Sequence, residues 1–201
     1  MLKKSTILFA LLFISAKAMN AQTLSIGPMV GVNVSSVTDS YNTKGLVGAS
    51  LGGFANYSVN EHIGIGVKIL YSQLGTAFTD VTLIHRLNYV QIPVTGIYYF
   101  GQAGDKFRPK IFAGAYYGSL LKATLKNGDE VLNLDGQTTY NKVDIGALGG
   151  IGFNYLVGSR TWLNVDAGYN QGFSDLTRNT DTAHKNSALS LNVGISFPIG
   201  N

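Results

Sequence analysis

The residues with the clearest potential for chemistry are Lys68, Asp144 and Asp166, three charged residues inside segments that otherwise alternate apolar and small polar residues. All three stand on the polar face of that alternation. A charge on a buried face needs an opposite charge or several hydrogen bonds. Two interpretations stay open: a structural plug of ion pairs and hydrogen bonds, which we favour, and a path for protons or ions. The plug would consist of Lys68, Gln91, Asp144, Asn154, Asn164, Asp166 and Asn192.

Three histidines could serve as general bases, namely His62, His85 and His184. A lipid-modifying hydrolase or acyltransferase would need such a base beside a nucleophile and a carboxylate. His85 follows Asp80 closely in the sequence. His184 lies near Asp181 and Ser187. Such neighbours are common in polar loops, and no serine motif accompanies them, so we predict no catalytic residues and no enzyme.

Two short motifs bear a partial likeness to ligand sites. Asn127-Gly-Asp129-Glu130, with Asp135, resembles a fragment of a calcium loop but lacks the EF-hand spacing, so turn chemistry explains it better. The glycine-rich stretch 146–152 is not followed by a helix and is better explained as a strand of small residues than as a phosphate cradle. The chain has no cysteine. We therefore predict no metal and no cofactor.

The elements that would position these residues are strands. After residue 23 the chain shows eight segments in which apolar and small polar residues alternate with a period of two, as in half-buried strands. The fifth is the least clear because aromatic residues stand on both of its faces. The segments are Leu24–Ser36, Leu46–Tyr57, Ile63–Ser72, Asn88–Phe100, Lys110–Lys122, Asp144–Tyr155, Leu163–Asn170 and Leu189–Phe197.

The connections between these segments alternate in length. Short ones are predicted near residues 59–62, 101–108 and 157–160, and long polar ones near 37–44, 76–87, 124–141 and 175–187. Outer-membrane barrels have short periplasmic turns and long outer loops. With an even number of strands, both termini would then lie in the periplasm.

The first 21 residues have the layout of a cleaved signal peptide. Lys3 and Lys4 precede an apolar run, Ile7–Ile14, and Ala18 and Ala21 offer cleavage sites. Eight apolar residues are too few to cross a bilayer as a helix. The alternative is a buried N-terminal helix. We expect residues 1–21 to be the signal peptide and residues 22–201 to be one barrel domain.

Composition supports a membrane barrel. Of the 201 residues, 45% are hydrophobic and only 13% are charged, whereas soluble domains carry about 25% charged residues. Without the three lysines of the signal peptide, 12 basic residues face 11 acidic ones, so no basic patch remains to suggest nucleic-acid binding. The polar face carries glycine, serine and asparagine rather than the lysine and glutamate of a water-facing sheet. A soluble lipocalin-like barrel or sandwich is the alternative.

Aromatic residues gather at the strand ends assigned to the periplasmic side, where an interfacial girdle is expected. The predicted girdle is Tyr57, Tyr98, Tyr99, Phe100, Phe112, Tyr155, Trp162 and Phe197. The sequence therefore predicts an all-β, eight-stranded, antiparallel up-and-down transmembrane β-barrel in the outer membrane of a Gram-negative bacterium. Its lumen should be plugged by side chains rather than open.

Three segments resemble the PorT-like outer-membrane β-barrel family of Bacteroidetes: Asn88–Val94, Asp144–Gly152 and Leu189–Phe197. A signal peptide ending in Ala21-Gln22 fits the same family. The resemblance implies the fold and the outer-membrane location, and a link to type IX secretion and gliding, but it supplies no catalytic residues. One departure is the final Pro198-Ile-Gly-Asn201, where many outer-membrane barrels end in an aromatic residue. Phe197 is the candidate substitute.

Three functions follow as hypotheses. The leading one is a structural or interaction protein, anchored by the barrel, whose outer loops meet partners. The second is an accessory component of a type IX secretion or gliding system. The third, which we regard as unlikely on the histidine argument, is a lipid-modifying enzyme. The expected partners are outer-membrane lipid and other envelope or secretion proteins, and the barrel itself is expected to be monomeric.

Overall fold

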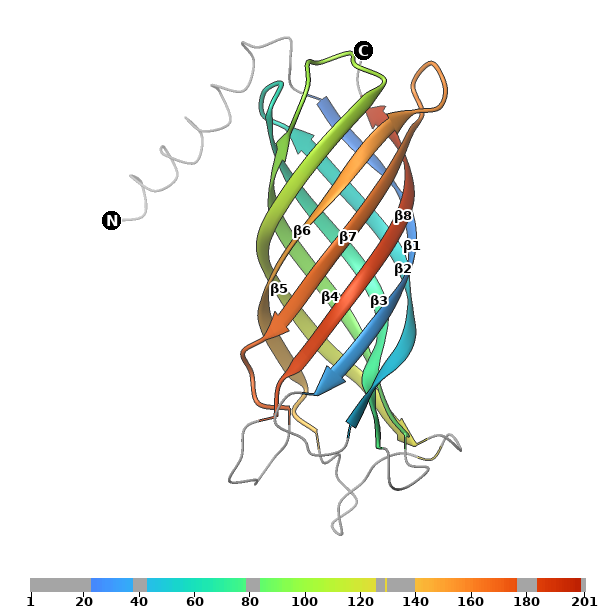
Figure 1. Ribbon diagram of the computed structural model, residues 1–201, viewed down its shortest axis with the longest axis vertical. Coiled ribbons are helices and arrows are strands. Elements are labelled where there is room, and N and C mark those ends of the chain that lie inside the picture. The colour runs from blue at the N-terminus through green and yellow to red at the C-terminus, as the bar shows by residue number, and fades with distance from the viewer. Residues whose placement is uncertain are drawn as a thin grey trace, which may run out of the picture.

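The computed structural model describes residues 23–37, 43–78, 84–125, 129, 140–176 and 184–199. They form eight antiparallel strands in sequence order, and the last strand pairs with the first to close a barrel (Figure 1). The strands are β1 (Thr23–Val37), β2 (Thr43–Ser58), β3 (Ile63–Phe78), β4 (Ile84–Tyr99), β5 (Phe107–Leu125), β6 (Val143–Leu156), β7 (Trp162–Gly172) and β8 (Asn186–Ile199).

The predicted up-and-down topology is confirmed, with all eight segments observed as strands. The segment whose alternation is weakest in the sequence, β5, is the longest strand, at 19 residues. Its lumen-facing positions hold Phe112, Tyr116 and Leu120, all buried, while Ile111 and Tyr117 on the other face are exposed. Because β5 carries apolar residues on both faces, its sequence alternates less clearly between apolar and polar residues. In the described part of the chain, no helix is long and apolar enough to cross a membrane.

The two ends of the barrel differ. The start of β1, the end of β8 and the three short connections lie together at the top of Figure 1, which we call the terminal end. The opposite end is the loop end. At the β2–β3 turn, the Asn60 side chain accepts hydrogen bonds from the backbone N–H groups of His62 and Ile63. The predicted signal peptide lies outside the described residues, as do residues 38–42, 79–83, 126–128, 130–139 and 177–183 of the predicted long connections.

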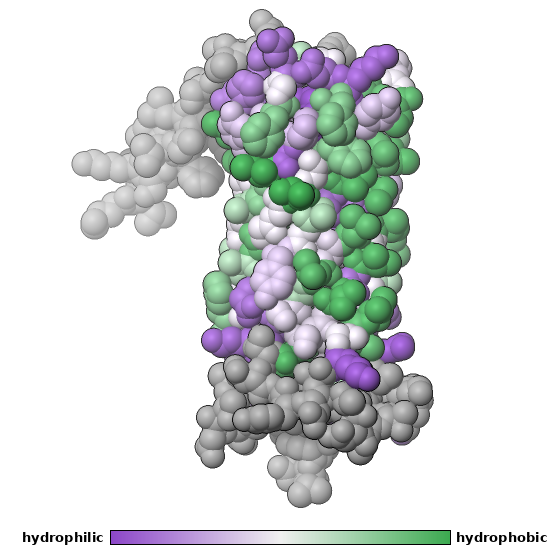
Figure 2. Space-filling view, in the orientation of Figure 1, coloured by the Kyte–Doolittle hydropathy of each residue, from purple (hydrophilic) through white to green (hydrophobic). Residues whose placement is uncertain are grey.

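The outer wall is apolar. Figure 2 shows hydrophobic residues along the side of the barrel and hydrophilic residues at the terminal end. Removing so much apolar surface from water favours a lipid surrounding, which a soluble barrel would not require. Exposed large apolar side chains include Val30, Val32, Val47, Leu51, Ile69, Val94, Ile145, Ile151, Leu189 and Leu191.

The lumen is filled by pairing large side chains on β5 with glycines on β6. Opposite Phe112 stands Gly150, and opposite Tyr116 stands Gly146. A Cβ atom built on Gly150 would lie 2.6 Å from the Phe112 ring, and one built on Gly146 would lie 2.6 Å from the Tyr116 ring. The glycine-rich stretch is thus a strand, as predicted, and its glycines make room for the side chains of its neighbour.

Candidate functional site

Three charged side chains from three strands meet in the lumen near the terminal end. Lys68 of β3 donates to Asp166 of β7 at 2.8 Å, and Lys110 of β5 lies 2.7 Å from the other carboxylate oxygen. We call this group the ion triad (Lys68, Asp166 and Lys110). All three residues are buried. The Lys68 ammonium also lies 5.3 Å from the centre of the Phe112 ring, a cation–π contact.

Amides and hydroxyls surround the ion triad. The Asn164 side chain, fully buried, donates to the Ser196 hydroxyl at 2.9 Å. The Ser50 hydroxyl donates to the Asn192 side-chain oxygen at the same distance. Gln91 is buried on the lumen face of β4. The two hydrogen bonds replace part of the water that these polar groups lose inside the barrel, while Gln91 Nε2 and Asn164 Oδ1 are buried without a partner among the described residues.

Asp144 forms a separate centre toward the loop end. One of its carboxylate oxygens accepts hydrogen bonds from the Tyr116 hydroxyl at 3.1 Å and the Asn186 amide at 2.9 Å. Its strand partner, Gly118, stands eight positions beyond Lys110 on β5, roughly 26 Å along the strand. Asp144 takes part in neither ion pair of the ion triad. The residues predicted to form one plug therefore form two separate polar centres.

The loop end of the lumen is packed with apolar side chains. Leu176 and Tyr140 come from the connections flanking β7 and β6, and they lie on side chains of the strands. The Tyr140 hydroxyl bonds His85 Nδ1 at 2.5 Å, and burial raises the pKa of Tyr140 to about 12, so it is neutral at physiological pH. We call this group the apolar cap: Leu74, Leu87, Tyr89, Leu120, Ala123, Tyr140, Leu176 and Ala188.

Among the described residues, two cavities in the lumen differ greatly in size. The one in the middle of the barrel, beside Lys68 and Gln91, has a volume of about 30 Å³, room for only one or two water molecules. The other, of about 380 Å³, opens at the terminal end. We call it the mouth cavity. Between them lies the ion triad, and beyond the small cavity lies the apolar cap.

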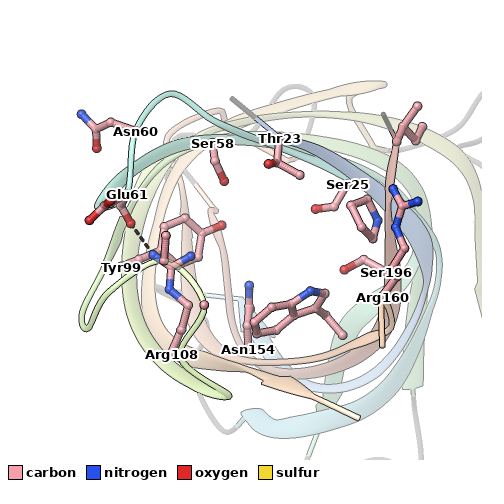
Figure 3. A pocket seen from close by; sticks show the side chains of 15 residues that line it. Thr23, Ser25, Ser58, Asn60, Glu61, Tyr99, Arg108, Asn154, Arg160 and Ser196 are labelled. Atoms are coloured by element: carbon pink, nitrogen blue, oxygen red, sulfur yellow. Dashed lines mark hydrogen bonds between the residues drawn. The ribbon is translucent and has the colours of Figure 1, made fainter. Parts of the chain in front are cut away.

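The mouth cavity is lined mainly by polar side chains. In Figure 3, Ser25, Ser58, Tyr99, Asn154 and Ser196 surround its centre. On one side of the cavity, Arg108 extends beside Tyr99 toward Glu61, whose backbone carbonyl accepts a hydrogen bond from the guanidinium (Figure 3). The same guanidinium packs on the Tyr99 ring, 4.8 Å from its centre.

The amino-acid sequence matches a known family of barrels. Residues 20–178 match the family model described as outer membrane protein beta-barrel domain. The chain belongs to this family. It is therefore a small outer-membrane β-barrel. No curated protein matches the chain.

Solved outer-membrane barrels share the fold. Neisserial surface protein A is 19% identical, with a TM-score of 0.55 over 87% of this chain and 97% of that one. OprG from Pseudomonas aeruginosa is 15% identical, with a TM-score of 0.58 over 90% and 97%. Outer membrane protein W of E. coli is 16% identical, with a TM-score of 0.58 over 90% and 100%. At these identities the likeness concerns the fold alone.

Within this outer-membrane barrel, the predicted girdle residues divide into two groups. Tyr57, Tyr98, Phe100, Tyr155 and Phe197 stand on the outer face near the terminal end, and all but the half-buried Tyr57 are exposed. Tyr98 stacks with His62 at 5.8 Å and meets Phe100 edge-on at 5.2 Å. Their outward position is the one that the predicted girdle needs, and the girdle itself stays a prediction.

Three predicted girdle residues face the lumen instead. Phe112 is only 8% exposed and packs with Ile97 and Tyr99, so neither Phe112 nor Tyr99 can meet lipid. Trp162 lines the mouth cavity and shares its strand face with the buried Asn164. The prediction was wrong for these three because it grouped aromatic residues by height along the strands and ignored which face each one occupies.

Two features were missed in the sequence. Lys110 belongs to the ion triad but opens the segment whose alternation is weakest, so its face could not be assigned. A further set of outward aromatic residues lies nearer the loop end, and their spacing from the first set could have revealed them. The set consists of Tyr71, Tyr117, Tyr169 and Phe173.

The described part of the chain contains only some members of each candidate catalytic group. His85 contacts Tyr140. The His184 backbone N–H donates to Asp175, and the Ser187 hydroxyl donates to the backbone carbonyl of Ser36. Asp80 and Asp181 lie outside the described residues. Among the described residues there is no group of three or more side chains that could bind a metal ion.

Proposed function

We propose that this outer-membrane barrel is a structural or interaction protein that acts through its loop end and does not conduct solutes. The observation that carries the proposal is the filled lumen. The ion triad, the 30 Å³ cavity and the apolar cap follow one another along the barrel. A pore needs a continuous water-filled path, whereas an eight-stranded barrel is narrow enough for side chains to fill.

Conductance across a planar lipid bilayer tests this proposal. The refolded full chain should give no steady single-channel current, while a porin prepared in the same way should conduct. A shift in gel mobility on boiling verifies that the inserted protein is folded. A reproducible current that scales with the amount of folded protein would show that the lumen conducts and would overturn the proposal.

The orientation is part of the proposal: the terminal end faces the periplasm and the loop end faces outward. The short turns, together with Thr23 and Ile199, all lie at one end, as in bacterial outer-membrane barrels. Because the chain has no cysteine, single cysteines report the orientation without background. Asp129→Cys at the loop end should react with a membrane-impermeant maleimide on intact cells, and Lys106→Cys in the β4–β5 turn should react only after permeabilisation. The reverse pattern would contradict the orientation.

Lipid contact is proposed for the outer wall, with aromatic residues at its two edges. On β5, Phe107 and Tyr117 share the outer face ten positions apart, and both are exposed. A tilted strand needs about 9–11 residues to cross the hydrocarbon layer. The two aromatic levels are thus one membrane crossing apart. The barrel is proposed to be monomeric, since its closed sheet leaves no strand edge for a second chain.

We also propose, more specifically, that the chain belongs to the PorT-like branch and has an accessory role in type IX secretion or gliding. This proposal rests on the resemblance of the three sequence segments. Deletion of the gene followed by analysis of the secreted proteins tests it. Loss of specific secreted proteins, restored by the intact gene, would support the accessory role. An unchanged set of secreted proteins would leave the anchor function as the better proposal.

A further inference from the structure

The mouth cavity carries an excess of positive charge. Arg108 and Arg160 line it, and Glu61 is the acidic residue among its lining residues. Directly behind the cavity, the two lysines of the ion triad share the single carboxylate of Asp166. Both layers therefore have a net positive charge. In a site that is partly shielded from water, such an excess favours an anion.

Arg108 lines the cavity and has one donor without an acceptor in the part of the chain that the structure describes. It stands two positions before Lys110 on the same face of β5, roughly 7 Å away along the strand. Tyr99 and the Glu61 carbonyl hold its guanidinium in place. Its Nε is buried and has no hydrogen-bond partner among the described residues. A buried N–H without an acceptor costs free energy, and a carboxylate or phosphate oxygen would satisfy it.

Asn154 supplies a matching acceptor. It is the strand partner of Arg108 across the β5–β6 pair. Its side-chain Oδ1 is also buried without a partner in the described structure. An amide oxygen can only accept, so the group that satisfies it must carry an O–H or N–H. The hydroxyls of Ser25, Ser58 and Ser196 around the same cavity can either donate or accept.

We propose that the mouth cavity binds a small anion whose carboxylate or phosphate group contacts Arg108 and whose hydroxyl or amine groups contact Asn154 and the serines. The volume of about 380 Å³ lies within the range of about 300–1,000 Å³ typical of small-molecule sites. The site lies at the opposite end of the barrel from the loops. It therefore neither requires nor supports the proposed function of the loop end.

The chain contains a single tryptophan, Trp162, and it lines the cavity, so its fluorescence can report binding. The refolded full chain would be titrated in detergent with glucose 6-phosphate, gluconate and glucose. We expect a saturable change with at least one of the two anions and none with glucose. A response to one anion alone identifies phosphate or carboxylate as the preferred group, and a response to both identifies a shared anion site. No saturable response to either anion, or an equal response to glucose, would overturn the proposal.

Two variants locate the site. Arg108→Gln removes the charge and should weaken binding about tenfold or more, because a charge-assisted hydrogen bond is lost. Arg86→Gln removes the same charge from an exposed position at the loop end and should leave binding unchanged. Asn154→Asp places a carboxylate in the cavity and should abolish binding by repelling the anion. This variant tests the site even if the Arg108→Gln protein loses its gel-mobility shift on boiling and is therefore not folded. Unchanged affinity in a folded Arg108→Gln or Asn154→Asp protein would overturn the assignment.

Discussion

The two halves of the lumen are both filled by side chains, but the terminal half is filled mainly by charged and polar groups and the loop half mainly by apolar ones. Near the terminal end, the ion triad and its amide and hydroxyl neighbours fill the barrel. Near the loop end, the apolar cap and the separate Asp144 centre fill it, and two residues of the cap come from the connections between strands. The first half depends on charge pairing, and the second depends on apolar burial of the kind found in soluble cores.

The difference has a physical reason in the proposed orientation. The strands contain 11 to 19 residues, whereas crossing the hydrocarbon layer takes about 9–11. The longer strands therefore extend past the membrane at the loop end, where water surrounds the wall and apolar burial inside gains free energy. Within the membrane, the apolar residues serve the outer wall, and the lumen keeps the polar ones. A polar lumen is stable only when its groups satisfy one another.

The largest effect is expected from breaking the charge pairing. Asp166→Asn leaves the two lysines of the ion triad facing each other without a carboxylate. Losing one partner of a buried ion group costs about 3–5 kcal/mol, since an uncompensated charge remains. The free energy of unfolding in lipid vesicles, measured by urea titration of Trp162 fluorescence, should fall by that amount.

The control for Asp166→Asn removes all the charges together. A triple variant with Lys68→Met, Asp166→Leu and Lys110→Met leaves no unpaired ion, and its stability should lie much closer to that of the original chain. If Asp166→Asn costs less than about 1 kcal/mol, charge pairing does not hold the terminal half together, and the contrast with the loop half fails.

The next effect concerns the apolar half. Leu120 belongs to the apolar cap and is 8% exposed, whereas its neighbour Leu121 is 59% exposed on the outer face. Leu120→Ala should lower the free energy of unfolding by about 3 kcal/mol, through lost burial and the cavity left behind. Leu121→Ala removes the same atoms and should cost about 1 kcal/mol or less. Equal losses in the urea titration would mean that the cap is not a packed core.

Both halves were only partly predictable from the sequence. The period of two in segments such as Leu189–Phe197 was sufficient to predict the strands, and the scarcity of lysine and glutamate on the polar face indicated which face points outward. It also placed Lys68, Asp144 and Asp166 in the lumen. The grouping into two centres depends on the strand register, which brings residues together across the barrel, and no pattern within one strand encodes it.

The apolar half escaped prediction for a related reason. Leu120 is an apolar residue on the lumen face and so breaks the simple rule that apolar means outward. Leu87 lies in the predicted connection 76–87, which the structure shows to be partly strand. Leu176 lies outside every predicted strand. A lumen that changes from polar to apolar along its length cannot be recognised from an alternation rule that assumes one character for each face.

The smallest effect is expected at the boundary between the two halves, where the Phe112 ring packs against β6. A Cβ atom on Gly150 would lie 2.2 Å from the Ala167 carbonyl oxygen and 2.6 Å from the Phe112 ring. On the adjacent Gly149, which faces outward, the nearest atom would be 3.5 Å away, an ordinary contact. Gly150→Ala should therefore cost about 2 kcal/mol through overpacking, while Gly149→Ala should be nearly neutral.

The same urea titration distinguishes the two glycine variants, and a second substitution identifies the cause. If the ring of Phe112 contributes to the overpacking, Gly150→Ala should lower the free energy of unfolding less in a Phe112→Leu background than in the original chain. Part of the loss should remain, because the contact with the ring is relieved but the contact with the Ala167 carbonyl is not. Equal stabilities of the Gly149→Ala and Gly150→Ala proteins would mean that the groups around Gly150 can move enough to accommodate an added methyl group. The two halves would then be joined by a loosely packed layer, and the contrast between them would be one of composition without a tightly packed boundary.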